Sequence, residues 1–136
     1  METVRTRYLG DLRTEATHVR SGNTLITDAP PDNKGKGEYF SPTDLVATSL
    51  GSCIMTIMGI AAREHNFSID GTSCSITKIM AENPRRVGEI AIEFDFKMRH
   101  YTEKQKKILH YCVKTCPVSQ TLHPSLFQNV RLVFRD

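Results

Sequence analysis

A cysteine stands in the middle of an almost uncharged stretch, LGSCIMTIMGIAARE, at residues 50–64 of the 136-residue sequence. A cysteine thiolate is a nucleophile and a metal ligand, but apolar surroundings raise the pKa of a thiol. In mid-helix Cys53 also gains nothing from the helix dipole, so the residues alone favour a buried, inert thiol. For Cys53 to react, a cation has to reach it from elsewhere in the fold.

A second cysteine, Cys116, is followed directly by Pro117. Proline disfavours a helical conformation for the residue before it and suits the first position of a helix, so we expect Cys116 to cap a helix that begins at Pro117. Backbone N–H groups and the helix dipole favour a thiolate at such a position. The sequence therefore predicts a lowered pKa and a reactive thiol at Cys116.

The other two cysteines are expected to be inert, Cys74 on a strand and Cys112 in the core one helical turn before Cys116. His110 and His123 lie near the Cys112–Cys116 pair, which raises the alternative of a zinc site. Paired zinc knuckles need two such cysteine pairs, and the sequence has only one. We therefore expect no metal.

Hydrophobic periodicity and turn residues predict the elements that must position these cysteines. Strands are expected at residues 4–8, 12–19, 24–27, 71–80, 87–99 and 130–134, and helices at 42–64 and 102–115, with a helical turn after Pro117. Ser41 and Asp44 have the spacing of a capping box for the first helix. The pattern predicts one α+β domain over residues 1–136, with sheet strands at both ends and a buried cysteine helix between.

Composition and charge argue against several classes of function and location. The net charge of +3 is scattered, which argues against nucleic-acid binding. The uncharged run at residues 45–62 holds a polar cluster near its middle, so we expect a buried helix and no membrane span. The first residues lack the apolar core of a signal peptide, so we expect the cysteines to lie in a reducing cytoplasm.

The apolar side chains of the cysteine helix point in every direction, which predicts a helix surrounded by protein. A monomer of this size can hardly enclose so long a helix on all sides. We therefore expect the helix to be buried at the interface of a homodimer.

Two motifs, taken together, resemble the OsmC/Ohr family of osmotically inducible and organic hydroperoxide resistance proteins. The first is SPTDLVA at residues 41–47 with LGSC at 50–53, and the second is TCPVS at 115–119. The resemblance covers nearly the whole chain. It implies an α+β fold with antiparallel sheets around the central cysteine helix, and an intertwined homodimer whose central helices pack together.

The resemblance also implies an enzyme, a thiol-dependent peroxidase that needs no cofactor. Cys53 would be the peroxidatic residue, reducing an organic hydroperoxide to an alcohol and becoming a sulfenate. Cys116 would resolve the sulfenate as a Cys53–Cys116 disulfide, which an external thiol or dithiol reduces. The supporting cation in the family is an arginine in a turn near the N-terminus, which corresponds here to Arg13, with Arg20 in reserve.

One position departs from the family pattern. Many peroxidase members have a glutamate after the proline that opens the helix, where it holds the arginine; here the residue is Thr43, with Asp44 next. Asp44 either replaces that glutamate or caps the helix. The departure places the chain in an OsmC-like branch of the family.

Two further functions stay open beside the peroxidase. One is a non-catalytic dimeric OsmC-like protein that binds an apolar ligand beside the central helix. The other is a cysteine hydrolase that pairs Cys53 with His65, His110 or His123, for which no local motif is present.

Overall fold

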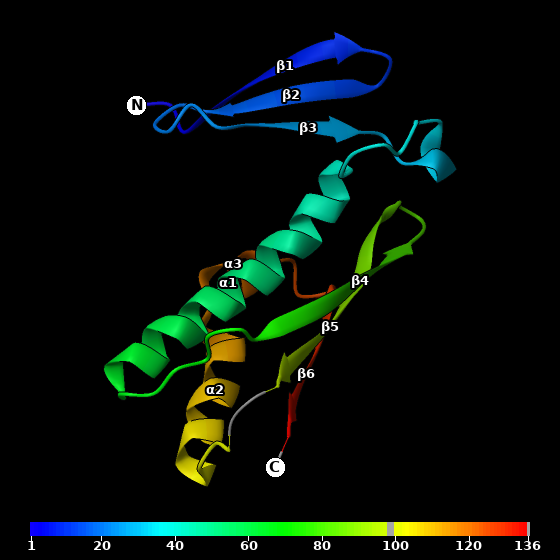
Figure 1. Cartoon of the computed structure of the whole chain (residues 1–136). Coiled ribbons are helices and arrows are strands. Elements are labelled where there is room, and N and C mark those ends of the chain that lie inside the picture. The colour runs from blue at the N-terminus through cyan, green and yellow to red at the C-terminus, as the bar shows by residue number, and fades with distance from the viewer. Residues whose placement is uncertain (98–99, 136) are drawn as a thin grey trace. The chain divides into compact units, whose positions relative to one another are not determined.

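The computed structural model describes residues 1–97 and 100–135. The described chain forms two compact units, Met1–Val46 and Ala47–Asp136, whose elements are labelled in Figure 1. The single domain expected over residues 1–136 stays a prediction.

The first unit holds a three-stranded antiparallel sheet in the order β1-β2-β3 (Figure 1). Its strands are β1 (Val4–Gly10), β2 (Arg13–His18) and β3 (Thr24–Asp28), as the sequence predicted within one or two residues. A tight turn joins β1 to β2, and Gly10 adopts a φ of 95° there, a conformation that glycine reaches without steric cost. The pairing of β2 with β3 places Arg13 opposite Asp28.

A loop rich in proline and glycine follows β3 and contains a 3₁₀ turn, η1 (Pro31–Asn33). It leads to the helix α1 (Pro42–Glu64). The Asp44 N–H donates to Oγ of Ser41 at 3.1 Å, and the Ser41 N–H donates to Oδ2 of Asp44 at 2.9 Å. This is the predicted capping box, which satisfies N–H groups that a helix start leaves without partners.

The buried residues of α1 recur every three or four positions and therefore lie on one face of the helix. They are Ala47, Leu50, Gly51, Ile54, Met58 and Ala62. Ile60, on another side, is 51% exposed. Within the described chain α1 is thus enclosed on one face, and the expected burial on all sides would require a second subunit.

The second unit contains a sheet in the order β4-β5-β6, with β4 (Ser73–Ala81), β5 (Arg86–Phe96) and β6 (Phe127–Phe134). The antiparallel arrangement expected from the sequence holds for β4 and β5, whereas β6 runs parallel to β5. The chain crosses over through α2 (Glu103–Thr115) and α3 (Pro117–Thr121) before β6, and such a crossover is what parallel pairing requires.

The alternation predicted for β5 is confirmed by the burial of Ile90, Ile92, Phe94 and Phe96. Met98 and Arg99, the end of that predicted strand, lie outside the described residues. Strand β6 begins at Phe127, three residues before its predicted start. Phe127 is followed by the polar residues Gln128 and Asn129, so this part of the strand shows no continuous hydrophobic alternation.

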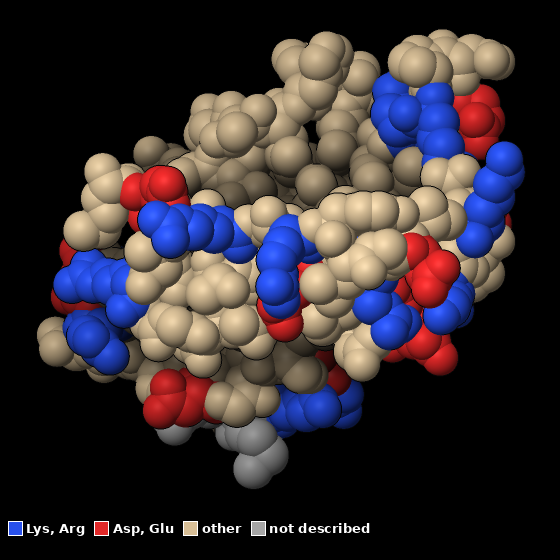
Figure 2. All heavy atoms as spheres, turned by 90° about the horizontal axis from the view of Figure 1, so that it is seen from above, with Lys and Arg blue, Asp and Glu red and all other residues tan. Residues whose placement is uncertain are grey.

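In the described part of the chain, α1 is long and apolar enough to cross a membrane, with a mean hydropathy of 1.8 over its most apolar window. The core helix of a soluble protein meets the same criteria, so this single helix is weak evidence for a span. Figure 2 shows basic and acidic side chains interspersed over the face in view, in keeping with the scattered charge of the sequence.

Candidate active site

Cys116 ends α2 and begins α3, as the sequence predicted. Its extended backbone, with φ −70° and ψ 142°, breaks the helical path, and Pro117 then takes the first position of α3. The Cys116 Sγ accepts a hydrogen bond from the Ser119 N–H at 3.2 Å. The side chain is fully buried, at 0% exposure.

The structure brings Cys53 and Cys116 together. The Cys53 side chain lies close enough to Cys116 to raise its pKa, so two cysteines far apart in the sequence come near each other in the second unit. Both are free thiols, and Cys53 is the more exposed of the two. The pair consists of one partly exposed sulfur and one buried sulfur close enough to influence each other, an arrangement that suits formation of a disulfide.

The lowered pKa predicted for Cys116 is wrong. Burial raises its pKa. Removing a thiolate from water costs more free energy than the backbone hydrogen bonds of the helix cap provide. The Ser119 N–H works in the opposite direction, and the hydrogen bond with Cys53 raises the pKa of Cys116 further. Cys116 therefore keeps its proton at neutral pH.

The other two cysteines are placed as inert thiols. Cys112 is 3% exposed and donates its S–H to the Ile108 carbonyl at 3.3 Å. Cys74 lies on β4, with its sulfur 3.6 Å from where a β-carbon on Gly51 would stand. Burial raises the pKa of both thiols.

Within the described residues no histidine is hydrogen-bonded to Cys53. His123 accepts the Ser125 N–H through Nδ1 at 3.0 Å, and the His110 ring lies 6.1 Å from that of Phe134. The described chain also contains no group of three or more His, Cys, Asp or Glu side chains that could hold a metal ion. The geometry thus gives no support to a hydrolase or a zinc site.

Arg13, in the first unit, is held by two carboxylates and an aromatic ring. Its Nε and Nη2 donate to both oxygens of Asp28 at 2.7 and 2.9 Å, and Nη2 also donates to Oε1 of Glu38 at 2.6 Å. The guanidinium lies 4.8 Å from the centre of the Tyr39 ring. Bidentate pairing and stacking of this kind fix the plane of an arginine.

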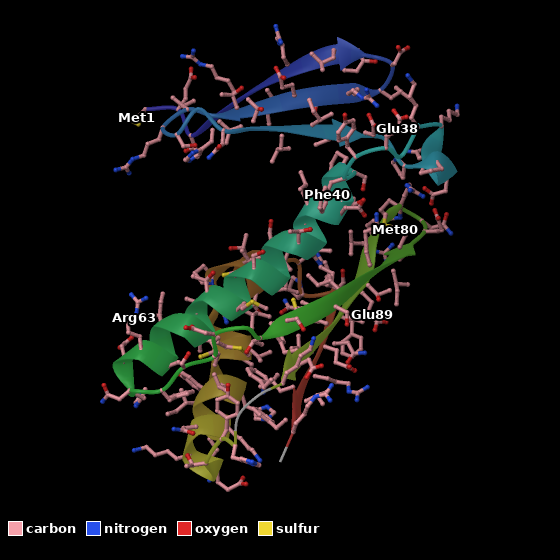
Figure 3. The ribbon with its side chains drawn as sticks, in the orientation of Figure 1. Met1, Glu38, Phe40, Arg63, Met80 and Glu89 are labelled. Carbon is pink, nitrogen blue, oxygen red and sulfur yellow. The ribbon has the colours of Figure 1, made fainter. Side chains whose placement is uncertain are left out.

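Asp28 and Glu38 together form a clamp on Arg13. Asp28 is its buried member, at 1% exposure. It also accepts the Glu38 N–H at 3.1 Å, and Figure 3 shows Glu38 on the loop beside the end of β3. The hydrogen bonds from Arg13 hold the pKa of Asp28 below its ordinary value against the effect of burial, and the two carboxylates raise the pKa of Arg13. The charges therefore stay on both partners at neutral pH.

Sequence reasoning missed Asp28 and Glu38. Asp44 forms the capping box of α1, and the carboxylates that hold Arg13 come from β3 and the loop instead. Arg20, the reserve candidate, is exposed in the turn between β2 and β3. Because Arg13 belongs to the first unit and the cysteine pair to the second, the support of Cys53 by Arg13 stays a prediction.

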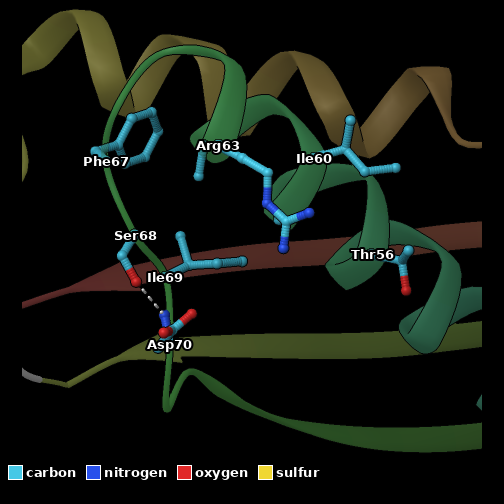
Figure 4. A pocket seen from close by; sticks show the side chains of 9 residues that line it. Thr56, Ile60, Arg63, Phe67, Ser68, Ile69 and Asp70 are labelled. Atoms are coloured by element: carbon cyan, nitrogen blue, oxygen red, sulfur yellow. Dashed lines mark hydrogen bonds between the residues drawn. The ribbon is translucent and has the colours of Figure 1, made fainter.

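A cavity of about 580 Å³ opens along α1, starting at Thr56, one turn after Cys53. Figure 4 shows the Arg63 guanidinium reaching into its opening, with Phe67 and Ile69 on one side and Ile60 on the other. The cavity is lined by Thr56, Gly59, Ile60, Ala62, Arg63, Phe67, Ser68, Ile69 and Asp70. Its walls combine apolar side chains with one cation, Arg63, and one carboxylate, Asp70.

Comparison with known proteins agrees with this architecture. The family described as OsmC-like protein matches residues 35–130, so the chain belongs to the OsmC-like family. A crystal structure from Psychrobacter arcticus, of a proposed osmotic stress induced and detoxification response protein, is 50% identical with a TM-score of 0.93; the match covers 98% of this chain and 96% of that one.

More distant structures share the fold. The organic hydroperoxide resistance protein OhrB of Bacillus subtilis is 18% identical with a TM-score of 0.71, over 96% of both chains. An organic hydroperoxide resistance protein from Legionella pneumophila is 12% identical with a TM-score of 0.73, over 98% of both chains. No curated protein matches the chain. The fold is that of the OsmC/Ohr proteins.

Proposed function

We propose that the protein is a cysteine-based peroxidase that reduces organic hydroperoxides to alcohols. The observation that carries the proposal is the closeness of Cys53 to the buried, capping Cys116, in a chain of the OsmC-like family. One thiol is accessible and the other is buried beside it, which suits a peroxidatic and a resolving cysteine.

In the first step the Cys53 thiolate attacks the terminal oxygen of the hydroperoxide ROOH. The S–O bond forms as the O–O bond breaks, so Cys53 becomes a sulfenic acid and the leaving alkoxide takes up a proton to give ROH. The Cys116 thiol, whose pKa is raised by burial and by the neighbouring Cys53, supplies this proton.

In the second step the Cys116 thiolate attacks the sulfenic sulfur, forming the Cys53–Cys116 disulfide and releasing hydroxide, which takes up a proton from solvent to give water. Two electrons have then passed from the thiols to the peroxide. An external dithiol restores both thiols by exchange and leaves as its own disulfide, so the cycle needs no bound cofactor.

Arg13 takes the part of the cation that supports the reactive Cys53 thiolate. The clamp by Asp28 and Glu38 supports this role, because an arginine fixed in one orientation acts without reorganisation. The protein works as a cytoplasmic homodimer in which a second subunit covers the exposed side of α1. The part-exposed apolar residues on that side, Ile60 among them, support this assembly.

The test is steady-state reduction of cumene hydroperoxide with dithiothreitol as reductant. Cys53→Ser is expected to abolish turnover, whereas Cys74→Ser, a matched change of a thiol outside the pair, keeps it. Cys116→Ser is expected to complete one turnover and then accumulate over-oxidised Cys53, seen by intact mass. Undiminished turnover in Cys53→Ser rules the proposal out.

A second candidate is a non-catalytic binder, favoured by the cavity along α1. Arg63 has no ion-pair partner among the described residues, and the walls at Ile60, Phe67 and Ile69 suit an apolar body. The ligand would be an apolar molecule that carries a carboxylate. Binding of a fluorescent fatty acid that Arg63→Ala weakens, in a protein without peroxide turnover, would select this function.

A further inference from the structure

One face of α2 carries an exposed basic and aromatic surface. Lys104, Lys107, Tyr111 and Lys114 follow each other at spacings of three and four residues, which places them along one side of the helix. All four are exposed, and Tyr111 is 72% exposed. These four residues are called the α2 basic face below.

The three lysines of this face have no carboxylate partner within the described chain. Lys106, on a neighbouring side of the helix, shows the contrast, since it pairs with Glu103 at 3.7 Å. Lysines of one sign around an exposed aromatic ring form a surface that complements an acidic partner, whereas charges of both signs usually alternate on a solvated helix face.

The face borders a groove of about 380 Å³ between α2 and the end of α1. Its floor is apolar, with Ala61, Ile108 and Cys112, and its rim carries the charged groups. The polar lining residues are Glu64, His65, Lys104, Lys107 and Tyr111. Glu64 is the one carboxylate among these lining residues, so cations outnumber it on the rim.

The groove and the α2 basic face lie on the helix that ends at the resolving cysteine. Cys112, in the floor, lies one helical turn before Cys116, and Lys114 lies two residues before it. A molecule seated on the α2 basic face would therefore be next to the helix that presents the resolving cysteine. Its charge would have to be negative to complement three unpaired lysines.

We propose that the α2 basic face is the docking surface for an acidic protein that carries the reducing dithiol. The inference rests on the proposed function, which requires an external reductant for the Cys53–Cys116 disulfide. Each cycle transfers two electrons: the partner's dithiol becomes a disulfide, and Cys53 and Cys116 return to thiols. Tyr111 supplies the apolar contact at the centre, and the lysines steer the partner and fix its orientation.

The probes are two short peptides with the same Cys-Gly-Pro-Cys centre, one flanked by glutamates and one by lysines. The protein is oxidised with diamide, so that no peroxide turnover is needed. At low salt the glutamate peptide is expected to reduce the disulfide at least about tenfold faster than the lysine peptide. High salt should remove this difference in rate, because it screens the charges.

The double variant Lys104→Glu/Lys107→Glu should lose or reverse the preference, whereas the matched variant Arg5→Glu/Lys34→Glu, from exposed sites in the first unit, keeps it. Dithiothreitol, which is small and neutral, should reduce all three proteins at one rate. Equal preference for the glutamate peptide in both double variants overturns the proposal.

A second measurement separates the docking surface from the redox chemistry. A dye-labelled glutamate peptide with both cysteines changed to serine is titrated into the reduced protein, and its affinity should fall at least about tenfold in Lys104→Glu/Lys107→Glu. If this binding is seen but diamide forms no Cys53–Cys116 disulfide, the peroxidase cycle fails and the acidic docking surface stands. Unchanged affinity, equal binding of a poly-uridine RNA at the same face, or dissociation of a dimer by the double variant overturns the docking proposal.

Discussion

A β-carbon placed on Gly51 would lie 2.5 Å from Cδ1 and 3.3 Å from Cγ1 of Ile76, so α1 and β4 approach each other here as closely as glycine allows. Gly59, eight residues further along the same helix, is its matched control, because a β-carbon there meets no described atom within 4 Å. We compare Gly51→Ala with Gly59→Ala. Both replacements make the same change in helix propensity, and only the first adds a clash.

The expected difference follows from two opposing effects. Alanine in place of glycine within a helix stabilises by roughly 0.5–1 kcal/mol. At Gly51 this gain is opposed by overpacking, which typically costs 1–3 kcal/mol and lies here near the lower end, about 1–2 kcal/mol, because the clashing atom is a terminal methyl group. Gly59→Ala should therefore stabilise, Gly51→Ala should be neutral or mildly destabilising, and the two should differ by about 1–2 kcal/mol.

The assay is thermal unfolding of both variants beside the unmodified protein, at one protein concentration so that any subunit association is held constant. For a chain of this length 1 kcal/mol corresponds to about 3–4 °C in Tm, so the variants should separate by roughly 3–8 °C. An equal rise in Tm for both would show that α1 does not press on β4 at Gly51, and the packing that positions Cys53 would have to be reconsidered.

Three further predictions concern the clamp, the inert thiols and the second helix. Because the pKa of Asp28 is lowered by Arg13, its stabilising contribution is complete above the ordinary aspartate pKa of about 3.9 and is lost as the pH falls through the lower folded value. Arg13→Met should therefore flatten the loss of Tm between about pH 5 and pH 3, and Arg7→Met, which removes an exposed pair with Glu15, should not. Iodoacetamide should alkylate Cys53 before Cys112, whose thiol is buried with a raised pKa, and denaturant should remove the difference; equal rates in the native protein would refute the assignment. Thr102→Ala removes the capping box with Gln105 and should cost about 1 kcal/mol by chemical denaturation, while an unchanged midpoint would show that the cap is not formed in solution.

Local sequence signals predicted the elements and the cap at Cys116 because each depends on residues next to each other in the chain. Pro117 fixes the conformation of Cys116. In β5 the alternation of apolar and polar residues directly indicates which side chains are buried. The parallel pairing of β6 and the direction of the Cys116 pKa shift depend on what packs around these residues. Burial of a thiol is a property of the tertiary structure, and here it outweighs the local cap.

The sequence alone could have predicted one of the two carboxylates that hold Arg13. A hairpin with its turn at residues 20–23 sets the register of β2 and β3, and extending the third strand by one residue places Asp28 opposite Arg13. Glu38 carries no such signal, because it sits in an irregular loop whose path depends on contacts with Asp28. The closeness of Cys53 and Cys116 likewise depends on the tertiary structure of the second unit, which no local spacing encodes.

The measurement that tests the central claim most directly is peptide mass mapping of the reduced protein after one equivalent of cumene hydroperoxide. We predict a Cys53–Cys116 disulfide formed within about seconds, one equivalent of the alcohol, and free thiols at Cys74 and Cys112. Cys53 that remains a thiol in the presence of unconsumed hydroperoxide would contradict the peroxidase function, and the contact between the two cysteines would then be a matter of packing alone.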